Sequence, residues 1–82
     1  MLVDTGALRA GLSRFAPDAD PEPPPWVLPQ TEILLVLEGA ARIEIEDGPT
    51  LDLRPGDMAS LPKGAVTRWH LTLPFKEMWV LV

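Results

Sequence analysis

The most distinctive pattern in the sequence is a run of apolar residues between Glu32 and Gly39. Residues 33–37 read Ile-Leu-Leu-Val-Leu, so a strand built from them has no polar face. This pattern is typical of a strand that is covered by protein on both sides. Glu32 places a carboxylate at the start of the strand, where it must stay in water, find a partner or become neutral through a shifted pKa.

Downstream of Gly39, apolar and polar residues alternate in short segments. A period of two predicts half-exposed strands, and we expect them at residues 41–46, 50–53, 58–61, 65–73 and 76–82. Turn residues separate them: Asp47-Gly48 predicts a hairpin, Pro55-Gly56 a type II turn and Pro62-Lys63-Gly64 another turn, and Pro74 ends the penultimate strand. Short strands at this spacing, without a helical pattern, predict an all-β sandwich or barrel.

The first part of the chain differs in composition from the rest. Residues 1–16 are moderately apolar and contain two glycines, which favours extended structure over a helix. Residues 17–29 contain six prolines and three acidic residues, which predicts an acidic surface connection with polyproline character. Within it, we expect Trp26-Val27-Leu28 to be anchored in the core. The single domain thus divides into an extended N-terminal segment with its connection, residues 1–25, and a barrel, residues 26–82.

Size and composition point to a second copy of the chain as support. A chain of 82 residues buries only about 60% of its unfolded surface. The absence of cysteine excludes disulfides, and the single histidine, His70, excludes a histidine-rich metal site within one chain. We therefore expect a homodimer.

Charge and hydropathy argue against several other partners. The net charge is −5 and the Lys and Arg residues are scattered, so we expect neither nucleic acid nor a membrane surface as a partner. The start of the chain lacks a signal-peptide pattern, and no apolar run is long enough to span a bilayer. The expected location is the cytoplasm.

Two spaced motifs lie in the predicted barrel. Glu32 is followed seven positions later by Gly39, and Gly56, Pro62 and Gly64 keep the spacing glycine, five residues, proline, one residue, glycine. In this order and at this separation they resemble the two motifs of the cupins. The resemblance covers roughly residues 26–80 and implies a single-domain cupin jelly-roll β-barrel.

The similarity is closest to single-domain cupins of the ureidoglycine aminohydrolase and ethanolamine-utilisation type. That subgroup has an aromatic residue six positions before the glutamate, a Val-Leu-Glu-Gly phrase, a tryptophan after the second motif and a lysine near the last strand. Trp26, residues 36–39, Trp69 and Lys76 match these features.

The metal ligands of the family are mostly missing. Cupins usually hold a metal with three histidines and the glutamate, but here Trp26, Leu28 and Thr67 stand in the histidine positions and Glu32 alone remains. A lone carboxylate beside a hydroxyl is a poor site for zinc, iron or nickel. His70 does not replace the missing ligands, because in a strand it faces away from Thr67. We expect no metal and no cofactor.

The resulting prediction is a metal-independent pocket that binds a small organic molecule. Its mouth is formed by Glu32, Thr67, Trp69 and Trp26, with Ile43, Val36 and Leu71 behind them. Glu32 would hold a polar or cationic group, the tryptophans would provide contact area, and Thr67 would orient the ligand. Either Trp79 or Met78 should also face the interior.

Two alternatives remain at this point. The first is an aminohydrolase- or isomerase-like enzyme that acts on a small molecule through Glu32, a candidate catalytic residue, or through a weakly held metal. The second is a barrel that is filled by side chains and acts only as a dimeric structural or interaction module.

Overall fold

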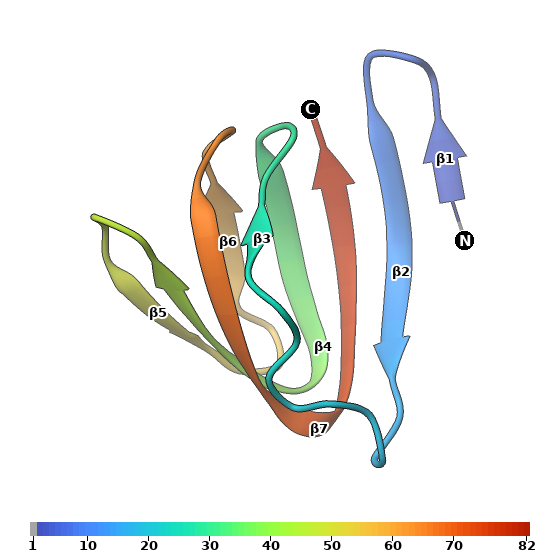
Figure 1. Cartoon of the computed structure of the whole chain (residues 1–82). Coiled ribbons are helices and arrows are strands. Elements are labelled where there is room, and N and C mark those ends of the chain that lie inside the picture. Colours follow the sequence, from blue (N-terminus) through green and yellow to red (C-terminus); the bar gives the residue numbers. More distant parts are fainter. Residues whose placement is uncertain (1) are drawn as a thin grey trace.

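All regular elements of the described residues are strands. The computed structural model describes residues 2–82, and its strands are β1 (Leu2–Asp4), β2 (Arg9–Phe15), β3 (Trp26–Val27), β4 (Glu32–Ile45), β5 (Thr50–Leu53), β6 (Met58–Leu61) and β7 (Val66–Leu81) (Figure 1). The predicted all-β fold is confirmed. Among these residues there is no helix that could cross a membrane. The cytoplasmic location stays a prediction.

The two long strands β4 and β7 each correspond to two predicted strands. The expected breaks at Gly39 and Pro74 are wrong, because the chain bends at both places and continues its pairing. At Gly39 the φ angle is +76° and the pairing register shifts on either side of Glu38, as in a β-bulge. A Cβ atom at position 39 would overlap the carbonyl oxygens of Thr72 and Pro74, so the two bends cross in close contact.

These bends fold one antiparallel sheet into two layers. The strand order is β1-β2-β7-β4-β5, with β3 added to β7 and β6 added to β4. The first layer contains β1, β2, β6, the N-terminal half of β4 and the C-terminal half of β7. The second layer contains β3, β5 and the other halves of β4 and β7, and Figure 1 shows β7 curving from one layer into the other at the bottom of the view. The predicted barrel is therefore open, because no hydrogen bonds join β1 to β5 among the described residues.

The core lies between the two layers. Its central side chains are Leu28, Leu34, Val36, Ile43, Leu61 and Phe75, each at most 1% exposed. In β7 the predicted alternation is confirmed, because Thr67, Trp69 and Leu71 are buried while Arg68 and Thr72 are exposed.

The prediction that residues 33–37 are covered on both sides is wrong for the single chain. Leu34 and Val36 are buried, but Ile33 and Leu35 are only partly buried and Leu37 is 38% exposed. The alternation of side chains along β4 puts these three residues on the outer face of the first layer.

The turns form as their sequences predict. Asp57 N–H donates to the Arg54 carbonyl over 2.9 Å, Gly56 has φ +92°, and the Asp57 carboxylate accepts from Arg54 N–H over 2.9 Å. The loop with Asp47-Gly48 joins β4 to β5 as a hairpin.

The N-terminal part joins the same sheet. Residues 9–15 pair with β7 along their whole length, which confirms the expected extended structure. The proline-rich connection is tied to β7 by Leu71 N–H, which donates to the Pro21 carbonyl over 2.7 Å. Of Trp26-Val27-Leu28, only Leu28 is anchored in the core, because Trp26 and Val27 are 42% and 56% exposed. The two side chains extend from a short strand at the edge of the second layer.

Candidate functional site

A hollow of about 610 Å³ opens between the layers, next to the proline-rich connection. Its walls are mainly apolar: three tryptophans, two carboxylates and several prolines face it. The lining residues that carry the argument are Trp26, Trp69, Trp79, Glu32 and Glu77. Pro23, Pro24 and Pro25 close one side, so the connection contributes a wall to the hollow.

The two carboxylates reach the hollow from neighbouring strands. Glu32 is the first residue of β4 and pairs with Leu81 of β7, and on the same β7 face Glu77 stands opposite Val36. Since inward side chains alternate, Glu77 shares its face with Trp79 and Leu81. The sequence did not reveal Glu77, because it left open whether Trp79 or Met78 faces the interior. In the structure Trp79 faces the hollow and Met78 lies outside. Glu77 is two residues before Trp79, and this spacing would have placed it on the same inward face.

Burial shifts both carboxylates towards their neutral forms. Glu32 is 2% exposed, and desolvation raises its pKa to about 7. Glu77 is 7% exposed, and desolvation, aided by repulsion from Glu32, raises its pKa to about 8. The Oε2 atom of Glu77 has no hydrogen-bond partner. The pair therefore holds at least one proton at neutral pH and keeps an unused polar atom beside the hollow.

The indole N–H groups of two tryptophans are already bonded within the chain. Trp69 Nε1 donates to Thr67 Oγ1 over 2.9 Å, and Trp79 Nε1 donates to Ser13 Oγ over 2.9 Å. Thr67 Oγ1 in turn donates to the Trp26 carbonyl over 2.8 Å. With these donors occupied, Trp69 and Trp79 offer the hollow their ring surfaces.

The structure brings three of the four predicted ligand-binding residues together. Glu32, Trp26 and Trp69 line one hollow, as predicted, while Thr67 does not line it. Thr67 is fully buried and its hydroxyl is used by Trp26 and Trp69, so it positions Trp69 instead of facing a ligand. Val36 and Ile43 lie in the core behind, and Leu71 reaches the hollow itself. Contact of these residues with a ligand stays a prediction.

The residues at the usual cupin metal positions do not fit a metal. Leu28 offers no donor atom and is buried, and the Thr67 hydroxyl is engaged with neighbours. Within residues 2–82, no group of three or more His, Asp or Glu side chains could hold an ion. Glu32 and Glu77 alone would leave most coordination positions of a transition metal unfilled.

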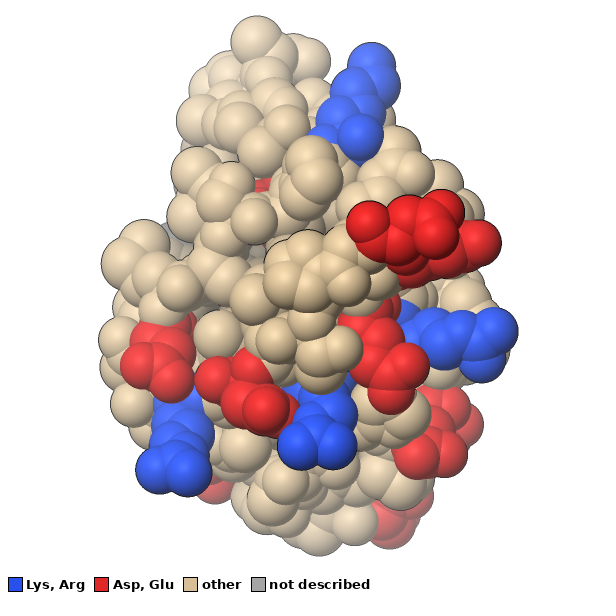
Figure 2. Space-filling model, turned by 90° about the vertical axis from the view of Figure 1, so that its left-hand side faces the viewer, with Lys and Arg blue, Asp and Glu red and all other residues tan. Residues whose placement is uncertain are grey.

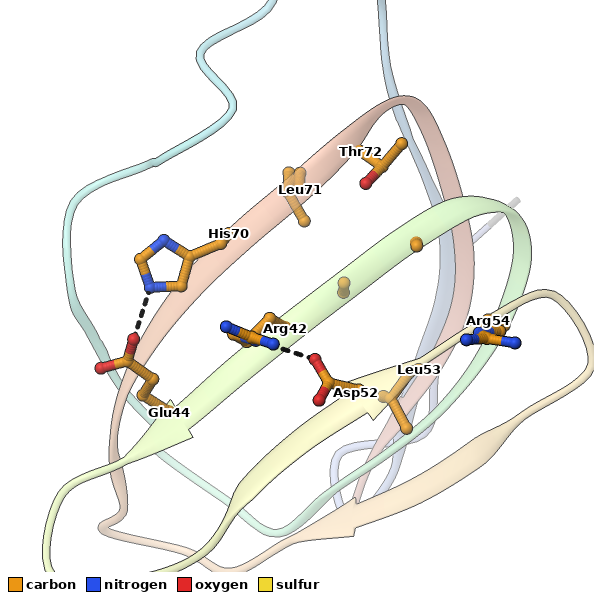
Figure 3. A pocket seen from close by; sticks show the side chains of 10 residues that line it. Arg42, Glu44, Asp52, Leu53, Arg54, His70, Leu71 and Thr72 are labelled. Atoms are coloured by element: carbon orange, nitrogen blue, oxygen red, sulfur yellow. Dashed lines mark hydrogen bonds and ion pairs between the residues drawn. The ribbon is translucent and has the colours of Figure 1, made fainter.

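A second hollow lies on the outer face of the second layer and has a different character. Figure 3 shows its polar lining, in which His70 faces Glu44 and Arg42 faces Asp52. His70 Nε2 lies 2.8 Å from Glu44 and Nδ1 lies 2.9 Å from Glu22 of the proline-rich connection. Both neighbours are carboxylates, so only the doubly protonated ring can donate to both, and the bonds to Glu22 and Glu44 raise the pKa of His70. As predicted, His70 faces away from Thr67.

Charged side chains of both signs share the surface. Figure 2 shows the side of the molecule that lies at the left in Figure 1, where Lys and Arg are interspersed with Asp and Glu and the upper half is mostly uncharged. No basic patch is visible on this face. That nucleic acid is not a partner stays a prediction.

Comparison with known proteins places the chain among cupins. The family model described as the EutQ-like cupin domain matches residues 23–78. No curated protein sequence matches the chain.

Solved structures agree with this match. A protein from Neisseria meningitidis is 16% identical with a TM-score of 0.80, and the match covers 100% of this chain and 80% of that one. A protein from Salmonella typhimurium, named as an ethanolamine utilization protein Q (EutQ), is 28% identical with a TM-score of 0.75. EutQ from Clostridium difficile is 22% identical with a TM-score of 0.77.

The match to the two EutQ proteins is partial on their side. It covers 93% and 94% of this chain but only 58% and 57% of the Salmonella and Clostridium proteins. The chain thus spans little more than half the length of these relatives. The fold is that of the cupins, and the predicted jelly-roll class is confirmed.

Proposed function

The chain belongs to the EutQ-like cupin family, and on that premise we propose that its inner hollow binds a small organic molecule carrying a cationic group, without a metal. The observation that carries the proposal is the pairing of Glu32 and Glu77 in one hollow between the layers. A cation is the ligand group that compensates buried carboxylates, because it replaces the proton that they otherwise retain.

The remaining walls suit an organic cation better than a metal ion. Indole rings attract cations through their faces, and Trp26, Trp69 and Trp79 line the hollow. The volume of about 610 Å³ lies in the range of small-molecule sites. A hollow of this size argues against the alternative in which side chains fill the barrel.

Binding should be linked to proton release. With pKa values of about 7 and about 8, Glu32 and Glu77 are both mostly protonated at pH 6. A bound cation favours their ionised forms, so affinity should rise as the pH rises from 6 to 8 while the ligand keeps its charge.

The test is a thermal-shift and calorimetric panel of small amines at pH 6, 7 and 8. The panel includes ethanolamine, because the name of the Salmonella neighbour refers to its utilization, and a quaternary amine, with uncharged alcohols of similar size as controls. We expect at least one amine to raise the melting temperature, more at pH 8 than at pH 6, and the alcohols to have no effect.

Substitutions link the signal to the hollow. Glu32→Gln and Glu77→Gln should each reduce affinity about tenfold or more, whereas Glu44→Gln on the outer face should leave it unchanged. Equal binding of amines and alcohols, or binding that survives both substitutions, would contradict the proposal.

A second candidate function is proton transfer to or from a bound small molecule. Its support is the pKa of about 7 for Glu32, which suits a general acid or base at neutral pH. It predicts that a bound amine is converted over time, and that Glu32→Gln abolishes conversion more completely than binding. A ligand recovered unchanged after prolonged incubation would leave binding as the function.

A further inference from the structure

The inner hollow is lined by a positive charge that the proposed function does not use. Arg9, the first residue of β2, lines the hollow together with Glu32 and Glu77. Arg9 stands opposite Leu81 of β7, and Leu81 stands opposite Glu32 of β4, so these three residues form one row across the sheet. Two strand spacings separate the Cα atoms of Arg9 and Glu32 by about 10 Å.

The opposite charges lie at different depths in the hollow. Glu32 is 2% exposed and Glu77 is 7% exposed, whereas the side chain of Arg9 is 50% exposed. The guanidinium group therefore lies at the mouth of the hollow, and the two carboxylates lie at its inner end. A ligand that enters the hollow meets a cation first and carboxylates afterwards.

Arg9 does not neutralise the two buried carboxylates. Within residues 2–82, no ion pair joins Arg9 to Glu32 or Glu77, and its one ion pair is with Asp4 over 3.5 Å. An exposed pair of this length holds the guanidinium group weakly, so Arg9 can exchange Asp4 for the acid group of a ligand.

Apolar surface separates the two charged ends of the hollow. Trp79 lies on β7 between Leu81 and Glu77, and its ring faces the hollow because its N–H group is bonded to Ser13. Opposite Trp79, β2 carries Gly11, which adds no side chain. The indole ring gives the carbon chain of a ligand a surface to pack against.

We propose that the ligand of the inner hollow is a zwitterion of the amino-acid class, with its amine against Glu32 and Glu77 and its carboxylate on Arg9. The inference rests on the proposed function and adds the second charge of the ligand. Arginine suits this role because its planar fork binds a carboxylate through two parallel N–H donors. A simple amine would use only the inner end of the hollow.

The experiment compares amino acids with matched amines by calorimetry at pH 8. Glycine, β-alanine, γ-aminobutyrate and ε-aminocaproate form the amino-acid series, and each is paired with the alkylamine that lacks its carboxylate. Alkanoic acids without an amine complete the panel. At the chain length that fits, we expect the carboxylate to raise affinity at least about tenfold. Affinity should peak at one length, because both contacts form only when the ligand spans the two ends.

Substitutions of Arg9 assign the carboxylate contact. Arg9→Gln should lower the affinity for the best amino acid to that of its matched amine, and should change amine binding less than about threefold. Arg9→Glu should reverse the preference, so that a diamine of the same length binds more tightly than the amino acid. Arg14→Gln is the control for one lost positive charge, because Arg14 lies on the opposite face of β2 and does not line the hollow.

Asp4→Asn separates ligand binding from a structural role of Arg9. Loss of the competing carboxylate should raise the affinity for amino acids and leave the affinity for amines unchanged. A purely structural ion pair would not give this result. Circular dichroism checks the fold of each variant, and the exposure of Arg9 makes its replacement compatible with the core.

The outcomes distinguish this inference from the proposed function. If amines bind and their amino acids bind no more tightly, or if the advantage of the amino acids persists in Arg9→Gln, the zwitterion is overturned and the cation site stands. If neither amines nor amino acids bind, both are overturned. Alkanoic acids that bind as tightly as the amino acids would also overturn both, because the amine would then contribute nothing.

Discussion

At the scale of single residues, the buried carboxylates Glu32 and Glu77 make the stability of the chain depend on pH. Both have folded pKa values above the ordinary value of 4.5. The folded chain therefore holds protons that the unfolded chain releases, so stability falls as the pH rises from about 4.5 to about 8.

Glu77→Gln tests this directly, because glutamine keeps the shape and cannot ionise. We expect the variant to lose less stability between pH 5 and pH 9 than the wild type, and to be more stable by about 2 kcal/mol at pH 9. The gain is smaller than the full pKa shift would give, because an ionised Glu77 can draw water into the hollow.

Urea unfolding at each pH is the measurement. Glu46→Gln, at an exposed turn position, controls for the loss of one negative charge. Parallel pH profiles for wild type and Glu77→Gln would show that Glu77 is solvated in the folded chain.

At the scale of elements, the two bent strands depend on the close crossing at Gly39. Replacement by alanine adds a Cβ atom against backbone oxygens and places a side chain at a φ angle of +76°. We expect Gly39→Ala to destabilise the chain by about 3 kcal/mol or more, as strain and overpacking add together.

Gly56→Ala is the matched control for the crossing. Gly56 also has a positive φ angle, of +92°, but a Cβ atom there meets no other atom within 4 Å. Its replacement should cost only about 1–2 kcal/mol. Equal losses of unfolding free energy for the two variants would mean that the bends tolerate a wider crossing.

A second link between elements is the bridge from the proline-rich connection through His70 to β4. The protonated ring joins Glu22 and Glu44, so its stabilisation is complete below pH 6.5 and is lost as the pH rises through the raised pKa of His70.

The titration of the single imidazole is measurable by NMR. We expect its midpoint above 6.5 in the wild type, with a larger decrease in Glu22→Gln than in Glu44→Gln, because the bond to Glu22 is the largest cause of the shift. Asp52→Asn, whose carboxylate contacts Arg42, should leave the midpoint in place. If the titration midpoint of His70 is the same in Glu22→Gln as in the wild type, the bridge does not persist in solution.

At the scale of the whole molecule, the sequence carried enough information for the fold class and for part of the site. Alternation and turn residues depend on local geometry, so the strands and the turns at Pro55-Gly56 and Pro62-Lys63-Gly64 could be predicted. The continuity of β4 and β7 could not, because it depends on Gly39 meeting Thr72 and Pro74 from a distant part of the chain.

The site shows the same division. Glu32 was recognisable as a carboxylate in an apolar strand, and it lies where it was expected, beside Trp26 and Trp69. Glu77 was hidden because its direction depends on the register of β7 against β4. Thr67 was expected to line the hollow, but its hydroxyl is hydrogen-bonded to Trp26 and Trp69. The sequence pattern gives no information on such hydrogen bonds.

The alternation along the paired halves of β4 and β7 offers a simple rule for engineering. In residues 32–36 the even positions face inward, and in residues 75–81 the odd positions do. Of these inward positions, Glu32, Glu77, Trp79 and Leu81 line the hollow. A combinatorial library restricted to these four would remodel the inner cavity, while one restricted to the intervening positions would change only the exterior. Recognition chemistry and surface properties could then be evolved in separate rounds on the same two segments.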